Sequence, residues 1–86
     1  MLVELGDSRE AVSARLKKVR EILDLDQKTF AAKAGILPQT YGPFETCARD
    51  LTLEAAKKIR KTYGIPLEFL FFGSMSDLPH RIAAHL

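Results

Sequence analysis

Few side chains in this 86-residue chain could do covalent or metal chemistry. Cys47 is its one cysteine, and no motif supplies the neighbouring base that a nucleophilic thiol needs. His80 and His85 could bind a metal, but a spacing of five does not place both on one face of a helix. We therefore favour a bystander thiol and solvated tail histidines, and we expect no metal and no cofactor.

The sequence also lacks the residue sets that are typical of enzymes. It contains no Ser/His/Asp set, no paired carboxylates spaced for acid–base catalysis and no glycine-rich phosphate loop. A chain of 86 residues is long enough for one small domain but not for a deep substrate cavity as well. We therefore expect a single domain over residues 1–86 that is not an enzyme and takes no small-molecule substrate.

The segment that is most informative about function contains two short predicted helices joined by a tight turn. One helix begins after Asp26 and the other at Pro38, and the segment that joins them contains Gly35. Glycine takes a left-handed conformation without strain, so Gly35 allows a sharp turn between the helices. This arrangement predicts a helix-turn-helix over about residues 26–46, whose second helix is presented to the major groove of DNA.

The elements that must position this segment also show helical periodicity. A first helix, capped by Asp7 or Ser8, has an apolar face, with Arg15 among the polar residues of its other face. A helix after Thr52 ends at Gly64; its expected inward residues are Leu53, Ala56, Ile59 and Tyr63. Its basic residues form either a solvated face or a stripe that faces phosphates; they are Lys57, Lys58, Arg60 and Lys61. A short helix between Pro66 and Gly73 follows.

Four gapless motifs carry a family resemblance. They are Arg15-Leu16-x-x-Val19-Arg20, Leu25-Asp26-Gln27-x-x-Phe30-Ala31-x-x-Ala34-Gly35-Ile36, Thr40-Tyr41-x-x-Phe44-Glu45 and Gly64-Ile65-Pro66-Leu67-x-Phe69-Leu70-x-x-Gly73. With them the chain resembles the Cro/repressor-type helix-turn-helix family, also called XRE. The resemblance implies an all-α, lambda-repressor-like bundle of five to six short helices. It also implies a bacterial or phage regulator of transcription, repressor-like, that binds double-stranded DNA as a homodimer in the cytoplasm.

The resemblance assigns roles to individual residues. Gln27 corresponds to the family's phosphate-contacting glutamine, which also braces the recognition helix, and Arg20 with Glu45 to its structural ion pair. The start of the recognition helix reaches base edges, and a glutamine there can pair bidentately with adenine. The residues that the resemblance places at the DNA are Gln27, Lys28, Pro38, Gln39, Thr40, Gly42, Pro43 and Arg49.

Three departures from the family pattern leave a second interpretation open. Leu37 replaces the usual Ser or Thr cap of the recognition helix, and Cys47 replaces a common glycine. Pro43 lies inside that helix, so we expect either a kink after Gly42 or a helix that restarts at Pro43. The alternative to a DNA-binding regulator is therefore a protein-interaction module that has kept the scaffold and lost DNA reading.

The two ends of the chain allow further expectations. No signal peptide is expected, because Met1 to Leu5 lack basic residues and contain Glu4. No membrane span is expected, because no uncharged stretch approaches the roughly 20 apolar residues that a membrane helix needs. A tail helix is expected over about residues 76–86. An apolar patch for dimer formation could include Phe71, Phe72, Leu78, Ile82 and Leu86. The net charge of +2 permits an acidic partner without demanding one.

Overall fold

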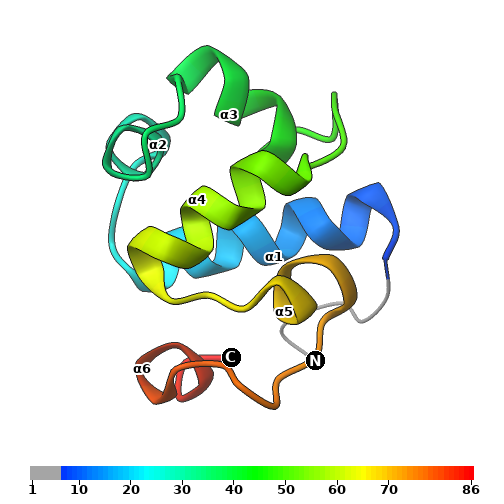
Figure 1. Ribbon diagram of the computed structural model, residues 1–86, viewed down its shortest axis with the longest axis vertical. Helices are drawn as coiled ribbons and strands as arrows, with labels where there is room; N and C mark the ends of the chain where they lie inside the picture. Colours follow the sequence, from blue (N-terminus) through cyan, green and yellow to red (C-terminus); the bar gives the residue numbers. More distant parts are fainter. Residues whose placement is uncertain (1–6) are drawn as a thin grey trace.

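The computed structural model describes residues 7–86, and these fold into six helices because apolar residues recur at helical spacing. The helices are α1 (Arg9–Ile22), α2 (Gln27–Lys33), α3 (Pro38–Glu45), α4 (Leu53–Tyr63), α5 (Leu67–Phe72) and α6 (His80–Ala83). No strand occurs in this range, which confirms the all-α class. The prediction about a signal peptide in the first five residues lies outside the described residues. The helix α3 lies at one end of the molecule and α6 at the other (Figure 1).

Three helices begin at the polar caps that the sequence predicts. The side chains of Ser8, Asp26 and Thr52 each accept the backbone N–H three residues further on, at 3.1, 2.7 and 3.1 Å. Such caps satisfy backbone donors that have no partner in the first helical turn. The pKa of Asp26 is lowered mainly by its backbone hydrogen bond, because that bond favours the charged carboxylate.

An aromatic cluster joins the second, third and fourth helices. The ring of Phe30 stacks on that of Tyr63 with 4.4 Å between centroids, and it lies 5.2 Å from the ring of Tyr41. The Tyr63 hydroxyl donates to the carbonyl of Phe30 at 2.8 Å, so its polar atom is satisfied inside the core. This cluster holds α2 and α3 in a fixed relation to α4.

Two residues lie on the opposite side of their helix from the one predicted. Arg15 was expected in solvent, but it is fully buried and its Nε donates to the carbonyl of Leu70 at 3.2 Å. The guanidinium thus connects α1 to a backbone carbonyl of α5. Leu53 was expected in the core but is 54% exposed, because Leu51, just before α4, is buried instead.

The predicted tail helix over residues 76–86 is wrong in its extent. The helix α6 has four residues and begins after Pro79, whose backbone is extended. Proline disfavours helical angles at the residue before it, so Leu78 cannot belong to the same helix. Arg81 joins the tail to the rest of the fold, since its Nη2 donates to the carbonyl of Tyr63 at 3.0 Å.

The predicted dimer patch is also wrong for two of its five members. Leu78 and Ile82 are buried in the core, with Ile82 fully enclosed. Phe71 and Leu86 are half-buried and pack against that core. Phe72 is 62% exposed, and Met75, which the sequence did not single out, is exposed as well. Burial removes Leu78 and Ile82 from any surface that a partner could reach.

The residues considered for covalent or metal chemistry are found in different settings. Cys47 is a half-buried free thiol just beyond α3, whereas His80 and His85 are exposed in the tail. Among residues 7–86 there is no group of three or more His, Cys, Asp or Glu side chains placed to hold a metal ion. None of the helices in the same range is long and apolar enough to cross a membrane.

Candidate nucleic-acid interface

A sharp turn between α2 and α3 sets the second helix across the first. Gly35 has φ +74°, the left-handed conformation for which the sequence predicted a glycine. The next residue, Ile36, is buried and donates its N–H to the carbonyl of Ala31 at 2.9 Å. The turn is therefore anchored in the core, and α3 begins in a fixed position.

The first turn of α3 presents its side chains to solvent. Pro38, Gln39 and Thr40 are all exposed, as a helix that reads a groove requires. As the sequence predicts, α3 has no side-chain cap, because Leu37 makes no side-chain hydrogen bond at the start of the helix. The carbonyl of Leu37 instead accepts the N–H groups of Thr40 and Tyr41, both at 2.9 Å.

The helix α3 runs through Pro43 without restarting there. Its eight residues extend from Pro38 to Glu45, so the restart at Pro43, one of the two alternatives that the sequence left open, is wrong. Two buried aromatic side chains, Tyr41 and Phe44, hold the helix on either side of the proline. Gly42 has no Cβ, which relieves part of the clash that a proline imposes on the residue before it. Gly42 and Pro43 are themselves half-buried and not fully presented to solvent.

The C-terminal end of α3 is closed by a left-handed residue that is not glycine. Cys47 has φ +65°, and the next N–H, that of Ala48, donates back to the carbonyl of Pro43 at 3.0 Å. A hydrogen bond that reaches back five positions is typical of the Schellman motif, in which the left-handed position is usually a glycine. A side chain in this conformation is strained by roughly 1–2 kcal/mol.

Cys47→Gly is therefore expected to raise the free energy of unfolding by about 1 kcal/mol, because glycine takes a positive φ without a Cβ clash. Urea denaturation of the two proteins measures the difference. Ala48→Gly is the matched control, since its φ is not positive and it should lose a little stability. Equal or lower stability of the Cys47 variant would contradict the strain at this position.

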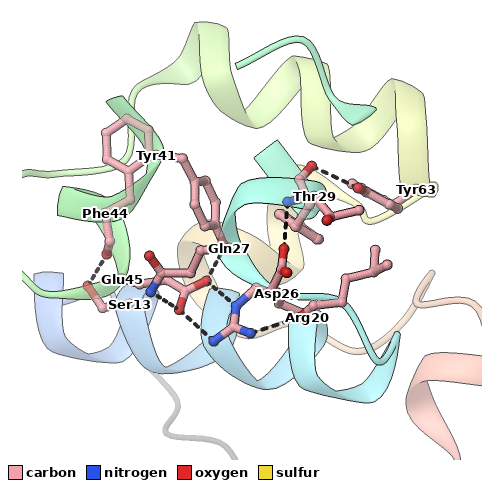
Figure 2. A network of polar contacts seen from close by, with 11 residues as sticks. Ser13, Arg20, Asp26, Gln27, Thr29, Tyr41, Phe44, Glu45 and Tyr63 are labelled. Atoms are coloured by element: carbon pink, nitrogen blue, oxygen red, sulfur yellow. Dashed lines mark hydrogen bonds and ion pairs between the residues drawn. The ribbon is translucent and has the colours of Figure 1, made fainter. Parts of the chain in front are cut away.

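A buried carboxylate ties α3 to α1 and α2. Glu45 accepts from Nε and Nη2 of Arg20 at 2.7 and 3.0 Å, which is the predicted ion pair (Figure 2). It also accepts from Nε2 of Gln27 at 3.1 Å and from the hydroxyl of Tyr41. Only 2% of the Glu45 side chain is exposed and 13% of that of Arg20. The third guanidinium nitrogen of Arg20, Nη1, donates to the carbonyl of Leu25 at 2.8 Å.

Two hydrogen-bond donors of this network, Arg20 and Tyr41, have raised pKa values. The hydrogen bond to Glu45 raises the pKa of Arg20, so the guanidinium remains charged. Burial raises the pKa of Tyr41 well above its usual value, and the hydrogen bond to Glu45 adds to this shift. The Tyr41 hydroxyl therefore keeps its proton, and both Tyr41 and Arg20 remain donors to Glu45.

Gln27 lies against the recognition helix, as the sequence predicted. A Cβ placed on Gly42 would lie 3.6 Å from Gln27 Oε1, so the amide extends along that side of α3. One of its two amide N–H groups is used by Glu45, which leaves the other for a further acceptor. Gln27 as a whole is exposed.

The remaining predicted contact residues are exposed at two places. Lys28 lies in the first turn of α2, close in sequence to Gln27. Arg49 lies beyond the other end of α3, in the segment that leads to α4. Gln27 thus lies against Gly42 and Glu45 in the second half of α3, whereas Gln39 and Thr40 are in its first turn. Arg49 lies beyond the last residue of the helix.

Three polar contacts around α3 were not predicted. Ser13 of α1 is buried and donates its hydroxyl to the carbonyl of Phe44 at 2.5 Å. Arg9 pairs with Asp50 at 2.8 Å, and this neighbour lowers the pKa of the Asp50 carboxyl. Lys58 donates to the carbonyl of Gly35 at 3.3 Å. Each contact joins residues at least 23 positions apart, so no local pattern could have revealed it.

Comparison with known proteins agrees with this geometry. A family model described as helix-turn-helix matches residues 16–70, from the middle of α1 to the middle of α5. No curated protein and no solved structure matches the chain. The matched range includes the turn at Gly35, the whole of α3 and the residues of the Glu45 network.

Proposed function

The chain belongs to the Cro/repressor-type (XRE) helix-turn-helix family of DNA-binding regulators, and from this premise we propose that it reads a specific double-stranded operator as a homodimer and represses transcription. The observation that carries the proposal is the exposed first turn of α3, which the buried Glu45 network holds in place. A base-reading side chain must start from a fixed position, because a loose one loses both affinity and discrimination.

Gln39 is the proposed base-reading residue. It is exposed in the first turn of α3, and its amide can donate to and accept from an adenine edge at the same time. Such a bidentate pair discriminates against a wrong base by about 1–3 kcal/mol. Gln27 and Lys28 are proposed to contact phosphates, which position the protein without reading sequence.

The fold engages several of the cations near the helix-turn-helix. Residues 9–49 contain eight basic and five acidic residues. Three of the basic side chains have partners within the fold: Arg9 pairs with Asp50, Arg15 donates to the carbonyl of Leu70, and Arg20 pairs with Glu45. Each phosphate contact steepens the plot of log affinity against log salt concentration by about 0.9, so we expect a shallow slope for one chain.

Because the electrostatic attraction between one chain and DNA is weak, we expect a dimer, in which two linked half-sites multiply the affinity. The exposed Phe72 and Met75 are a candidate contact between copies, in place of the buried Leu78 and Ile82.

Selection of bound duplexes from a random DNA pool tests the whole proposal. An enriched palindrome with half-sites about one helical turn apart is expected. An unenriched pool, with no salt-sensitive binding at low ionic strength, would leave the protein-interaction module as the better interpretation.

Two substitutions are expected to separate base reading from phosphate contact. Gln39→Ala should weaken binding to the selected operator about 5- to 150-fold and reduce the preference at one base pair, because it removes a bidentate contact. Lys28→Ala should weaken all sequences alike and lower the salt slope by about 1. Fluorescence anisotropy with specific and scrambled duplexes measures both effects. Equal losses on both duplexes for Gln39→Ala would assign it to the phosphates instead.

A further inference from the structure

An exposed leucine stands at the start of the recognition helix. Leu37 precedes Pro38 and Gln39, and it is 62% exposed. Its side chain makes no capping hydrogen bond, and a serine or threonine at this place would make one. The side chain of this leucine therefore neither caps the helix nor belongs to the buried core.

The backbone of Leu37 is held firmly, although its side chain is exposed. Its carbonyl accepts two N–H groups of α3, and the residue before it, Ile36, is buried. The residue after it is Pro38, whose ring fixes φ. The position of Leu37 relative to Gln39 is thus set before any partner binds, which lowers the entropy lost on binding.

We propose that Leu37 is a specificity-determining residue that packs against the 5-methyl group of a thymine, next to the base pair read by Gln39. The inference rests on the proposed function. In the major groove the thymine methyl is the apolar group that a base edge displays, while phosphates and the other base edges are polar. A rigidly presented aliphatic side chain beside a base-reading amide is complementary to that methyl.

The test compares thymine with deoxyuridine, which differs from it only by the methyl group. Each thymine of the selected operator is replaced in turn, and affinities for the full chain are measured by fluorescence anisotropy. One replacement in each half-site is expected to weaken the wild type about fourfold, the effect of exposing one methyl group. Leu37→Ala is expected to bind the thymine operator more weakly and to make no distinction between the two bases.

Two variants separate DNA reading from stability. Leu37→Ser should raise the melting temperature, because a serine caps α3, and should still lose the distinction between thymine and deoxyuridine. Leu53→Ala is the matched control, since Leu53 is an exposed leucine outside α3 and should leave the distinction unchanged.

The outcomes distinguish this inference from the proposed function. Salt-sensitive operator binding with no effect of any methyl group would overturn the role of Leu37 alone. The same conclusion would follow if Leu37→Ala kept the full fourfold distinction. Absence of binding to any duplex would overturn both the role of Leu37 and the proposed function.

Discussion

Glu45→Ala is expected to lower the free energy of unfolding by about 3–5 kcal/mol, the usual effect of breaking a buried ion pair. The loss is large because Arg20 would keep its charge at a site where only 13% of its side chain is exposed. Gln27 and Tyr41 would lose their acceptor at the same time. A domain of this length is stable by only about 4–13 kcal/mol, so the expected loss is a large part of the total stability.

Urea denaturation of wild type and variants measures this effect. Glu45→Gln keeps the size of the side chain and one acceptor, so its loss should be smaller than that of Glu45→Ala. Arg20→Ala with Glu45→Ala removes both charges and should be less destabilising than the sum of the two single changes. A loss below 1 kcal/mol for Glu45→Ala would show that the carboxylate contributes little to stability. Under conditions where Glu45→Gln is folded, weaker operator binding would connect the network to the position of Gln27.

Ile82→Ala is expected to lower the free energy of unfolding by about 2–5 kcal/mol, because the substitution leaves a cavity in a closed part of the core. Ile82 is fully buried and belongs to the same hydrophobic cluster as Leu16 and Phe69. It lies beyond the range 16–70 that the family model matches. The expected loss would therefore show that the tail contributes to the stability of the DNA-binding fold.

Thermal or urea unfolding, compared across tail variants, tests this contribution. Ile82→Val removes one methyl group and should cost about 0.5–1.5 kcal/mol. Asp77→Ala changes an exposed side chain of the same segment and should stay within about 0.5 kcal/mol of wild type. If Ile82→Ala were no more destabilising than Asp77→Ala, the tail would not form part of the core.

Much of the candidate site could be predicted because its signals are local. The cap at Asp26, the left-handed Gly35 and Pro38 at the first position of α3 each act within one turn of their own position. The Arg20–Glu45 pair came from the resemblance, because the two residues are 25 positions apart. The behaviour of α3 at Pro43 could not be predicted, since it depends on aromatic anchors that other helices bury.

The sequence by itself determined the helical class, the starts of the helices α1 to α5 and the turn that orients α3, because caps, glycines and apolar spacing act over a few residues. Only the tertiary structure decided which side chains are buried. Arg15 is in the interior because a carbonyl of α5 meets it there, and Ile82 is in the core because the tail folds back. Leu37 remains largely in solvent, although it is next to the buried Ile36. Burial depends on what packs against a side chain, and that partner lies elsewhere in the chain.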